Sequence, residues 1–424
     1  MYRPIDRVVF NVREIRLALR CTGTLLPQAR RSQTKQHPNH PTIEFAPPIS
    51  YYGIMMNELP WVISVKELLE LQRESAAHEK QRAVEREAAR QRADWVDTSL
   101  ANLDDLSEDE RERLDRYLHD ADEDDNDAST KPLATCPVVI ADVRWYLDGK
   151  SGNAAYLDGH IPGAVFVDLD TMLAGPATRE EGRHPLPLEE SFAAAMEVSG
   201  IADDTVVIAY DDAGGASASR LVWLLRASGH RAAVLNGGLN AWIDYISSLE
   251  STGSHPDGRL NMSGHVLESG EDLTVPEDAG AFSVRPFNAD WIASIEETCV
   301  AALTPDKAVI DARAPERYQG EDEPIDSRGG HIPGAYNLFH GEFIDSHGFF
   351  LDTRDIVSHV ESAGIDTSAQ PYAESPIIYC GSGVTATHEI VALAHAGIHS
   401  RLYPGSWSQY SATERSMVTG PDRT

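Results

Sequence analysis

The chain is poor in cysteine and in positive charge, and it contains no apolar run of membrane-spanning length. Its four cysteines are widely spaced and match neither a disulfide framework nor a zinc-binding pattern, which favours a reducing, cytoplasmic compartment. There are 36 lysines and arginines against 67 aspartates and glutamates. The resulting net charge of −31 argues against nucleic acid or an anionic membrane surface as a partner.

A repeated string divides the chain into two related halves. The sequence GHIPGA occurs at 159–164 and again at 330–335, and each copy follows a short apolar run that ends in an acid. Further matching pairs are the acid-terminated runs 138–142 and 309–311, and the apolar runs 206–210 and 377–379. Because β-branched runs alternate with helical stretches such as 219–228, each half is predicted to form parallel βα units. The repeat therefore predicts two similar α/β domains.

Cys380 stands where the apolar run 376–379 ends and a loop with two glycines, 381–386, begins. The glycines allow the backbone to curl so that successive N–H groups point inward, towards the start of a helix expected over 387–396. Such converging dipoles favour the thiolate, which is the nucleophilic form of cysteine. Cys380 is therefore the candidate nucleophile, and the alternative is a small buried apolar residue at a strand end.

The string YCGSGVTA at 379–386 resembles the active-site loop of tandem-domain rhodaneses, in particular the 3-mercaptopyruvate sulfurtransferase branch. Other strings typical of that family follow in the expected order, namely VIDAR at 309–313, RYQG at 317–320, GHIPGA at 330–335 and LYPGSWS at 402–408. The resemblance covers the chain from about residue 57 to the C-terminus, apart from one insertion. It implies an α/β fold of two rhodanese-like domains, each a small parallel sheet flanked by helices.

The resemblance also suggests how the chain is divided. We expect an N-terminal extension at 1–55, a first domain at 56–250, a linker at 251–284 and a second, catalytic domain at 285–424. A charged insertion at about 72–134 interrupts the first domain, with a helical run over 74–94, a second helix from the capping box at Ser107, and an acidic run at 120–127. It is either a solvated excursion or a docking surface for a partner.

The first half carries Asp211 at the position that matches Cys380. A carboxylate cannot carry a persulfide, so the first domain is expected to be catalytically silent and to cover or complete the site of the second.

The activity implied by the resemblance is sulfur transfer. The Cys380 thiolate would take sulfur from 3-mercaptopyruvate, releasing pyruvate, and the resulting persulfide would pass sulfur to a thiol, a thioredoxin-like protein or cyanide. No metal or organic cofactor is implied. Thiosulfate is the alternative donor, and a non-catalytic sulfur carrier or scaffold is the alternative of another class. A cysteine phosphatase would need an arginine where the chain has Ala386.

The resemblance assigns roles to further residues. Arg317 would bind the donor carboxylate, because a guanidinium fork suits that contact. Arg328 is a displaced second arginine. Around the nucleophile, Gly381, Gly383, Val384 and Thr385 would bind the donor.

Asp170, His184 and Ser382 would form a proton relay, which is useful because sulfur abstraction leaves a pyruvate enolate that must be protonated. The neutral pair Gly381-Ser382 disfavours a dianion such as thiosulfate. On this basis arginine at 381 and lysine at 382 would shift the preference towards that donor.

Overall fold

The computed structural model describes residues 58–101, 107, 111, 131–251, 266–270, 280–368 and 372–424. The extension expected at 1–55, the acidic run at 120–127 and nearly all of the second helix expected from Ser107 lie outside these residues. Within the described part, no helix is both long and apolar enough to cross a membrane.

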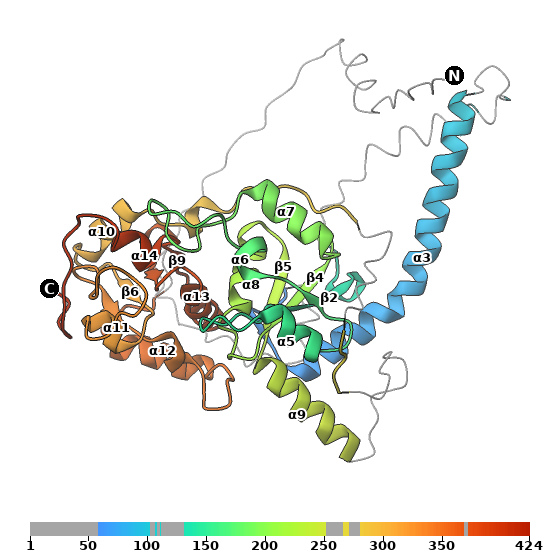
Figure 1. Cartoon of the computed structure of the whole chain (residues 1–424). Coiled ribbons are helices and arrows are strands. Elements are labelled where there is room, and N and C mark those ends of the chain that lie inside the picture. Colours follow the sequence, from blue (N-terminus) through green and yellow to red (C-terminus); the bar gives the residue numbers. More distant parts are fainter. Residues whose placement is uncertain are drawn as a thin grey trace, which may run out of the picture. The chain divides into compact units, whose positions relative to one another are not determined.

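The first sheet contains five parallel strands in the order β1-β5-β4-β2-β3. Figure 1 labels its three central strands, β5, β4 and β2. The strands are β1 (Val62–Ile63), β2 (Val138–Asp142), β3 (Val165–Phe166), β4 (Val206–Tyr210) and β5 (Arg231–Leu235). The helices connected to them are α5 (Gly152–Asp158), α6 (Leu169–Met172), α7 (Glu189–Val198), α8 (Ala218–Ala227) and α9 (Gly238–Ser251). β-branched residues dominate β2 and β4, and every residue of β4 is buried, as is usual for a central parallel strand covered on both faces.

The second sheet contains four parallel strands in the order β7-β6-β8-β9. The strands are β6 (Val309–Asp311), β7 (Tyr336–Asn337), β8 (Ile377–Tyr379) and β9 (Arg401–Leu402). The accompanying helices are α10 (Ile295–Ala302), α11 (Pro315–Gln319), α12 (Thr353–Ser362), α13 (Thr385–His395) and α14 (Ser406–Tyr410). Ile292 forms an isolated parallel bridge with Leu402, at the place that β1 takes beside β5 in the first sheet.

Short 3-10 turns complete the two domains. They are η3 (Leu133–Thr135), η4 (Ala289–Trp291), η5 (His340–Phe343) and η6 (Tyr372–Glu374).

Details outside the repeated strings also recur in both halves. A reciprocal capping box opens the first helix of each domain, with Glu67 Oε2 2.7 Å from Ser64 N, and Glu297 Oε2 2.8 Å from Ser294 N. Strands β2 and β6 each end in an aspartate that forms a buried ion pair with the arginine two residues later. The pairs are Asp142–Arg144 and Asp311–Arg313. The prediction of two similar parallel α/β domains is therefore confirmed.

Helix α3 (Val65–Ala101) is continuous over 37 residues. Its first turns bury Leu68, Leu69 and Leu71 in the first domain, and the Ser75 hydroxyl donates to the Cys136 carbonyl at 2.7 Å. The next three residues, 76–78, are exposed. The helical run expected at 74–94 thus continues the first helix of the domain and does not begin a separate element.

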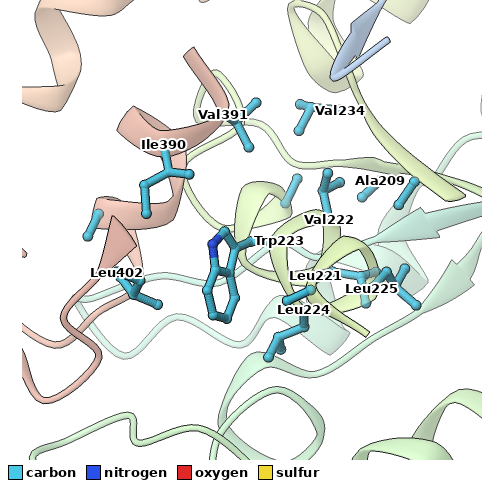
Figure 2. Packing of buried hydrophobic residues seen from close by; sticks show 14 of the residues in the cluster. Ala209, Leu221, Val222, Trp223, Leu224, Leu225, Val234, Ile390, Val391 and Leu402 are labelled. Carbon is cyan, nitrogen blue, oxygen red and sulfur yellow. The ribbon is translucent and has the colours of Figure 1, made fainter. Parts of the chain in front are cut away.

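One hydrophobic core is shared by the two domains. Helix α8 of the first domain packs against α13 of the second. Figure 2 shows Trp223 of α8 beside Ile390 of α13 and Leu402 of β9, and these side chains belong to a single buried cluster. Burying an indole at such a contact removes a large apolar area from water. This packing holds the loop after β8 against the first domain.

Candidate active site

Cys380 lies between the end of β8 and the start of α13, and its side chain is 1% exposed. Gly383 N donates to Cys380 Sγ at 3.2 Å, and Cys380 N donates to Ser406 Oγ at 3.1 Å. Gly383 has a φ of +81°, and a Cβ added there would lie 2.5 Å from the Pro404 carbonyl oxygen. Only glycine therefore fits this turn, which aims a backbone N–H group at the sulfur.

Helix α13 begins at Thr385, two residues before the expected start at 387. Thr385 consequently belongs to the first helical turn, with its side chain beside the sulfur-bearing loop.

A cavity of about 310 Å³ lies over Cys380 and is lined by both domains. The second domain contributes Gly381, Ser382, Val384, Thr385 and Arg317, all of which the sequence predicted as site residues. The first domain contributes Trp145 and Arg183, which the sequence did not single out. Two larger surface cavities, of about 520 and 550 Å³, are lined by no cysteine or histidine among the described residues.

Asp170, His184 and Ser382 form a continuous hydrogen-bonded chain. His184 Nδ1 lies 2.8 Å from Ser382 Oγ, and His184 Nε2 lies 3.1 Å from Asp170 Oδ1. Burial lowers the pKa of His184, although Asp170 acts to raise it, so the ring is neutral at neutral pH. A carboxylate only accepts, so Nε2 carries the proton and Nδ1 accepts from the serine hydroxyl.

Trp145 fixes the far end of this chain. Its Nε1 donates to both oxygens of Asp170, at 3.1 and 3.0 Å, and its ring meets the His184 ring edge-on at 5.5 Å between centroids. A tryptophan three residues after the end of β2 carries no spacing signal, so the sequence did not indicate this role.

Arg317 lines the cavity and is held by two buried acids. Its Nε and Nη2 atoms donate to Glu323 at 3.2 and 2.7 Å, and Nη2 lies 3.4 Å from Asp326 Oδ2. Burial acts to raise the pKa of Glu323, but hydrogen bonds from Arg317 and backbone N–H groups outweigh burial and hold the pKa below its ordinary value. Glu323 is therefore a carboxylate anion, and it orients the guanidinium group of Arg317.

Arg328, the displaced second arginine, does not reach the cavity. Its guanidinium donates to the carbonyl oxygens of Tyr410, Ser411, Thr413 and Arg415, so it holds the end of α14 and the segment that follows. These contacts give Arg328 a structural role.

Arg220 of α8 is a buried cation that joins the two domains. It is 0% exposed, and it donates to the carbonyls of His184 and Gly383 at 3.1 Å each, and of Pro185 and Leu173 at 3.2 Å each. Burial lowers its pKa to about 10, and the Cys380 sulfur acts in the opposite direction. Among the described residues no carboxylate pairs with Arg220. A positive charge is therefore buried next to the loop that carries Cys380.

The matching loop of the first domain is filled by Asp211. Its carboxylate accepts hydrogen bonds from the backbone N–H groups of Ala213, Gly215, Ser217 and Ala218, at 2.8 to 2.9 Å. The side chain is 1% exposed. The loop that could hold an anionic sulfur is therefore closed by the domain's own acid.

Comparisons with known proteins identify the class. Residues 125–245 and 295–413 each match the model of the rhodanese-like domain. The fold and the cysteine loop define a rhodanese-type sulfurtransferase, which is an enzyme.

The relatives agree in activity class. The chain is 38% identical over 279 residues to the putative thiosulfate sulfurtransferase SseB of Mycobacterium tuberculosis, covering 65% of this chain and 88% of that protein. It is 36% identical over 295 residues to a probable 3-mercaptopyruvate sulfurtransferase of Pseudomonas aeruginosa, covering 68% and 95%. The crystal structure of SseA from Escherichia coli, a 3-mercaptopyruvate sulfurtransferase, superposes with a TM-score of 0.51 at 30% identity, covering 64% and 92%. The chain belongs to the tandem-domain rhodanese family, which confirms the resemblance seen in the sequence.

Proposed function

We propose that the enzyme moves sulfur from 3-mercaptopyruvate, through a persulfide on Cys380, to a thiol acceptor. The observation that supports this donor is the Asp170–His184–Ser382 chain, whose serine lines the cavity over Cys380. Removing sulfur from 3-mercaptopyruvate leaves a pyruvate enolate, whose carbon must take up a proton. Removing sulfur from thiosulfate leaves sulfite, which needs no proton on carbon.

The transfer step balances within the site. The Cys380 thiolate attacks the donor sulfur, an S–S bond forms, and the electron pair of the breaking C–S bond passes to the pyruvate enolate. The donor S–H proton moves through Ser382 to neutral His184, where Asp170 stabilises the positive ring. The same proton then returns to the enolate carbon, leaving pyruvate and the Cys380 persulfide anion. Gly383 N–H and the buried charge of Arg220 favour an anion on this sulfur.

The remaining predicted residues bind the donor in this proposal. Arg317 contacts the carboxylate, and Gly381, Val384 and Thr385 surround the rest of the donor over Cys380. The acceptor is a small thiol or a thioredoxin-like protein of the cytoplasm, with cyanide as its substitute in an assay. In this enzyme the first domain spans residues 56–250, the linker residues 251–284 and the catalytic domain residues 285–424.

Thiosulfate is the second candidate donor, because one relative is a putative thiosulfate sulfurtransferase. In addition, two arginines lie beside the loop, although the loop residues Gly381 and Ser382 are themselves neutral. A Cβ added to Gly381 would lie 3.0 Å from Arg183 Nη2 and 3.3 Å from Arg317 Nη1. A side chain at 381 would crowd the ends of these two guanidinium groups, so the predicted exchange to arginine and lysine at 381 and 382 requires both arginines to move.

The test is kcat/KM for both donors side by side. We expect 3-mercaptopyruvate to be preferred by at least about tenfold, since one charged hydrogen-bond contact contributes about 1.5–3 kcal/mol and only this donor uses the relay. A preference for thiosulfate would overturn the donor assignment while leaving the enzyme class unchanged.

A further inference from the structure

Two guanidinium groups from different domains meet above the loop that carries Cys380. Arg183 belongs to the first domain and Arg317 to the second, and both line the cavity. The position that a Cβ of Gly381 would occupy lies 3.0 Å from Arg183 Nη2 and 3.3 Å from Arg317 Nη1. The missing side chain of Gly381 therefore leaves a small space that two N–H-bearing groups face.

Each guanidinium is fixed from behind and keeps one end unused. Arg183 Nη1 donates to Asp326, and Arg183 N donates to Ser408 Oγ at 3.1 Å. Arg317 uses Nε and Nη2 for Glu323 and Asp326. Within the part of the chain that the structure describes, neither Arg183 Nη2 nor Arg317 Nη1 has a hydrogen-bond acceptor. Both free ends lie at Gly381.

The two acids hold one end of each guanidinium and leave the other end facing Gly381. Glu323 and Asp326 side chains are 5% and 6% exposed, behind the guanidinium groups. Burial raises the pKa of Asp326 from its ordinary value, and the neighbouring Arg183 acts to lower it. An anion entering over Gly381 therefore meets two partly desolvated cations.

We propose that Arg183 is a specificity-determining residue that, together with Arg317, binds the anionic group of the sulfur donor above Gly381. The contact rests on the proposed function and adds to it, because it comes from the silent domain. Arg183 directly precedes His184, so a single loop of the first domain supplies both the anion contact and the proton relay. The contact between the two domains thereby selects a donor whose anionic group reaches Gly381 while its sulfur lies at Cys380.

The test compares a donor that has the carboxylate with one that lacks it. Wild type, Arg183→Ala, Arg183→Lys and Arg179→Ala are assayed with 3-mercaptopyruvate and with 1-mercapto-2-propanone. Arg179 is the matched control, since it lies on the same loop and donates to the Ala412 carbonyl, away from the cavity. Loss of one charged contact should lower kcat/KM for 3-mercaptopyruvate about 10- to 100-fold in Arg183→Ala, mainly through KM.

In the same variant the carboxylate-free donor should change less than about twofold, because it never made the contact. Arg183→Lys should recover part of the loss, and Arg179→Ala should behave as wild type. Equal losses for both donors would mark Arg183 as a structural residue and overturn the proposal. Unchanged KM for 3-mercaptopyruvate would do the same.

A binding measurement makes the test independent of turnover. Calorimetry of 3-mercaptopyruvate on Cys380→Ser should give a dissociation constant about tenfold higher when Arg183→Ala is added, and an unchanged constant overturns the proposal. If wild type uses thiosulfate and not 3-mercaptopyruvate, the donor assignment fails separately. In that case a raised KM for thiosulfate in Arg183→Ala still supports the anion contact, and an unchanged KM overturns it.

Discussion

The relay of Asp170, His184 and Ser382 makes the most demanding prediction about the chemistry. Ser382→Ala removes the hydroxyl that lies 2.8 Å from His184 Nδ1, and His184→Ala removes the group that exchanges protons with it. Either change breaks the same path between the donor and Asp170. Both side chains are largely buried, so bulk water replaces them poorly.

The size of the effect follows from the geometry. A positioned proton-transfer group contributes about 10²- to 10⁴-fold to rate, and each single alanine variant should lower kcat for 3-mercaptopyruvate by about 10²-fold, or roughly 2.7 kcal/mol. The double variant should lose little more than either single variant, because one interrupted path cannot be interrupted twice. The coupling energy should therefore be about 2–3 kcal/mol.

The assay is pyruvate release with 3-mercaptopyruvate, run beside sulfite release with thiosulfate on the same four proteins. Thiosulfate turnover should survive the substitutions better, since sulfite needs no proton on carbon. Multiplicative losses, equal for both donors, would refute the relay. They would instead assign His184 and Ser382 to packing at the domain interface.

Three further predictions concern the nucleophile, the silent loop and pH. Cys380→Ser should abolish sulfur transfer and prevent sulfur addition seen by intact-protein mass spectrometry, whereas Cys136→Ser and Cys299→Ser should keep most activity; turnover by the Cys380 variant would contradict the mechanism. Asp211→Ala should lower the free energy of unfolding in urea by about 3–5 kcal/mol, because four backbone N–H groups, three of them in buried residues, lose their acceptor, and a change below about 1 kcal/mol would contradict this.

Burial lowers the pKa of His388 from 6.5 to about 4, so the unfolded chain binds more protons between these values. The stability advantage of wild type over His388→Gln should thus shrink by roughly 2–3 kcal/mol as pH falls from 6.5 to 4, and a pH-independent difference would count against burial as the cause.

The sequence by itself determined the repeat and the two parallel sheets, and it pointed to Cys380 as the candidate nucleophile. These features depend on short-range signals: β-branched runs, the glycines around Cys380 and an acid at the matching position, Asp211. Local sequence signals predicted the end of a helix less reliably where no proline or glycine interrupts it. The run from Val65 onwards contains no proline or glycine up to Ala101, so α3 continued through the expected start of the insertion.

Only the tertiary structure decided which charged groups surround the sulfur. Arg183 and Arg220 lie about 200 and 160 positions before the loop that they contact, and they reach it because α8 and α13 share one core. Interdomain packing of this kind depends on the fit of two buried surfaces, which no local pattern encodes. The same packing brings an arginine of the first domain, Arg183, to Gly381.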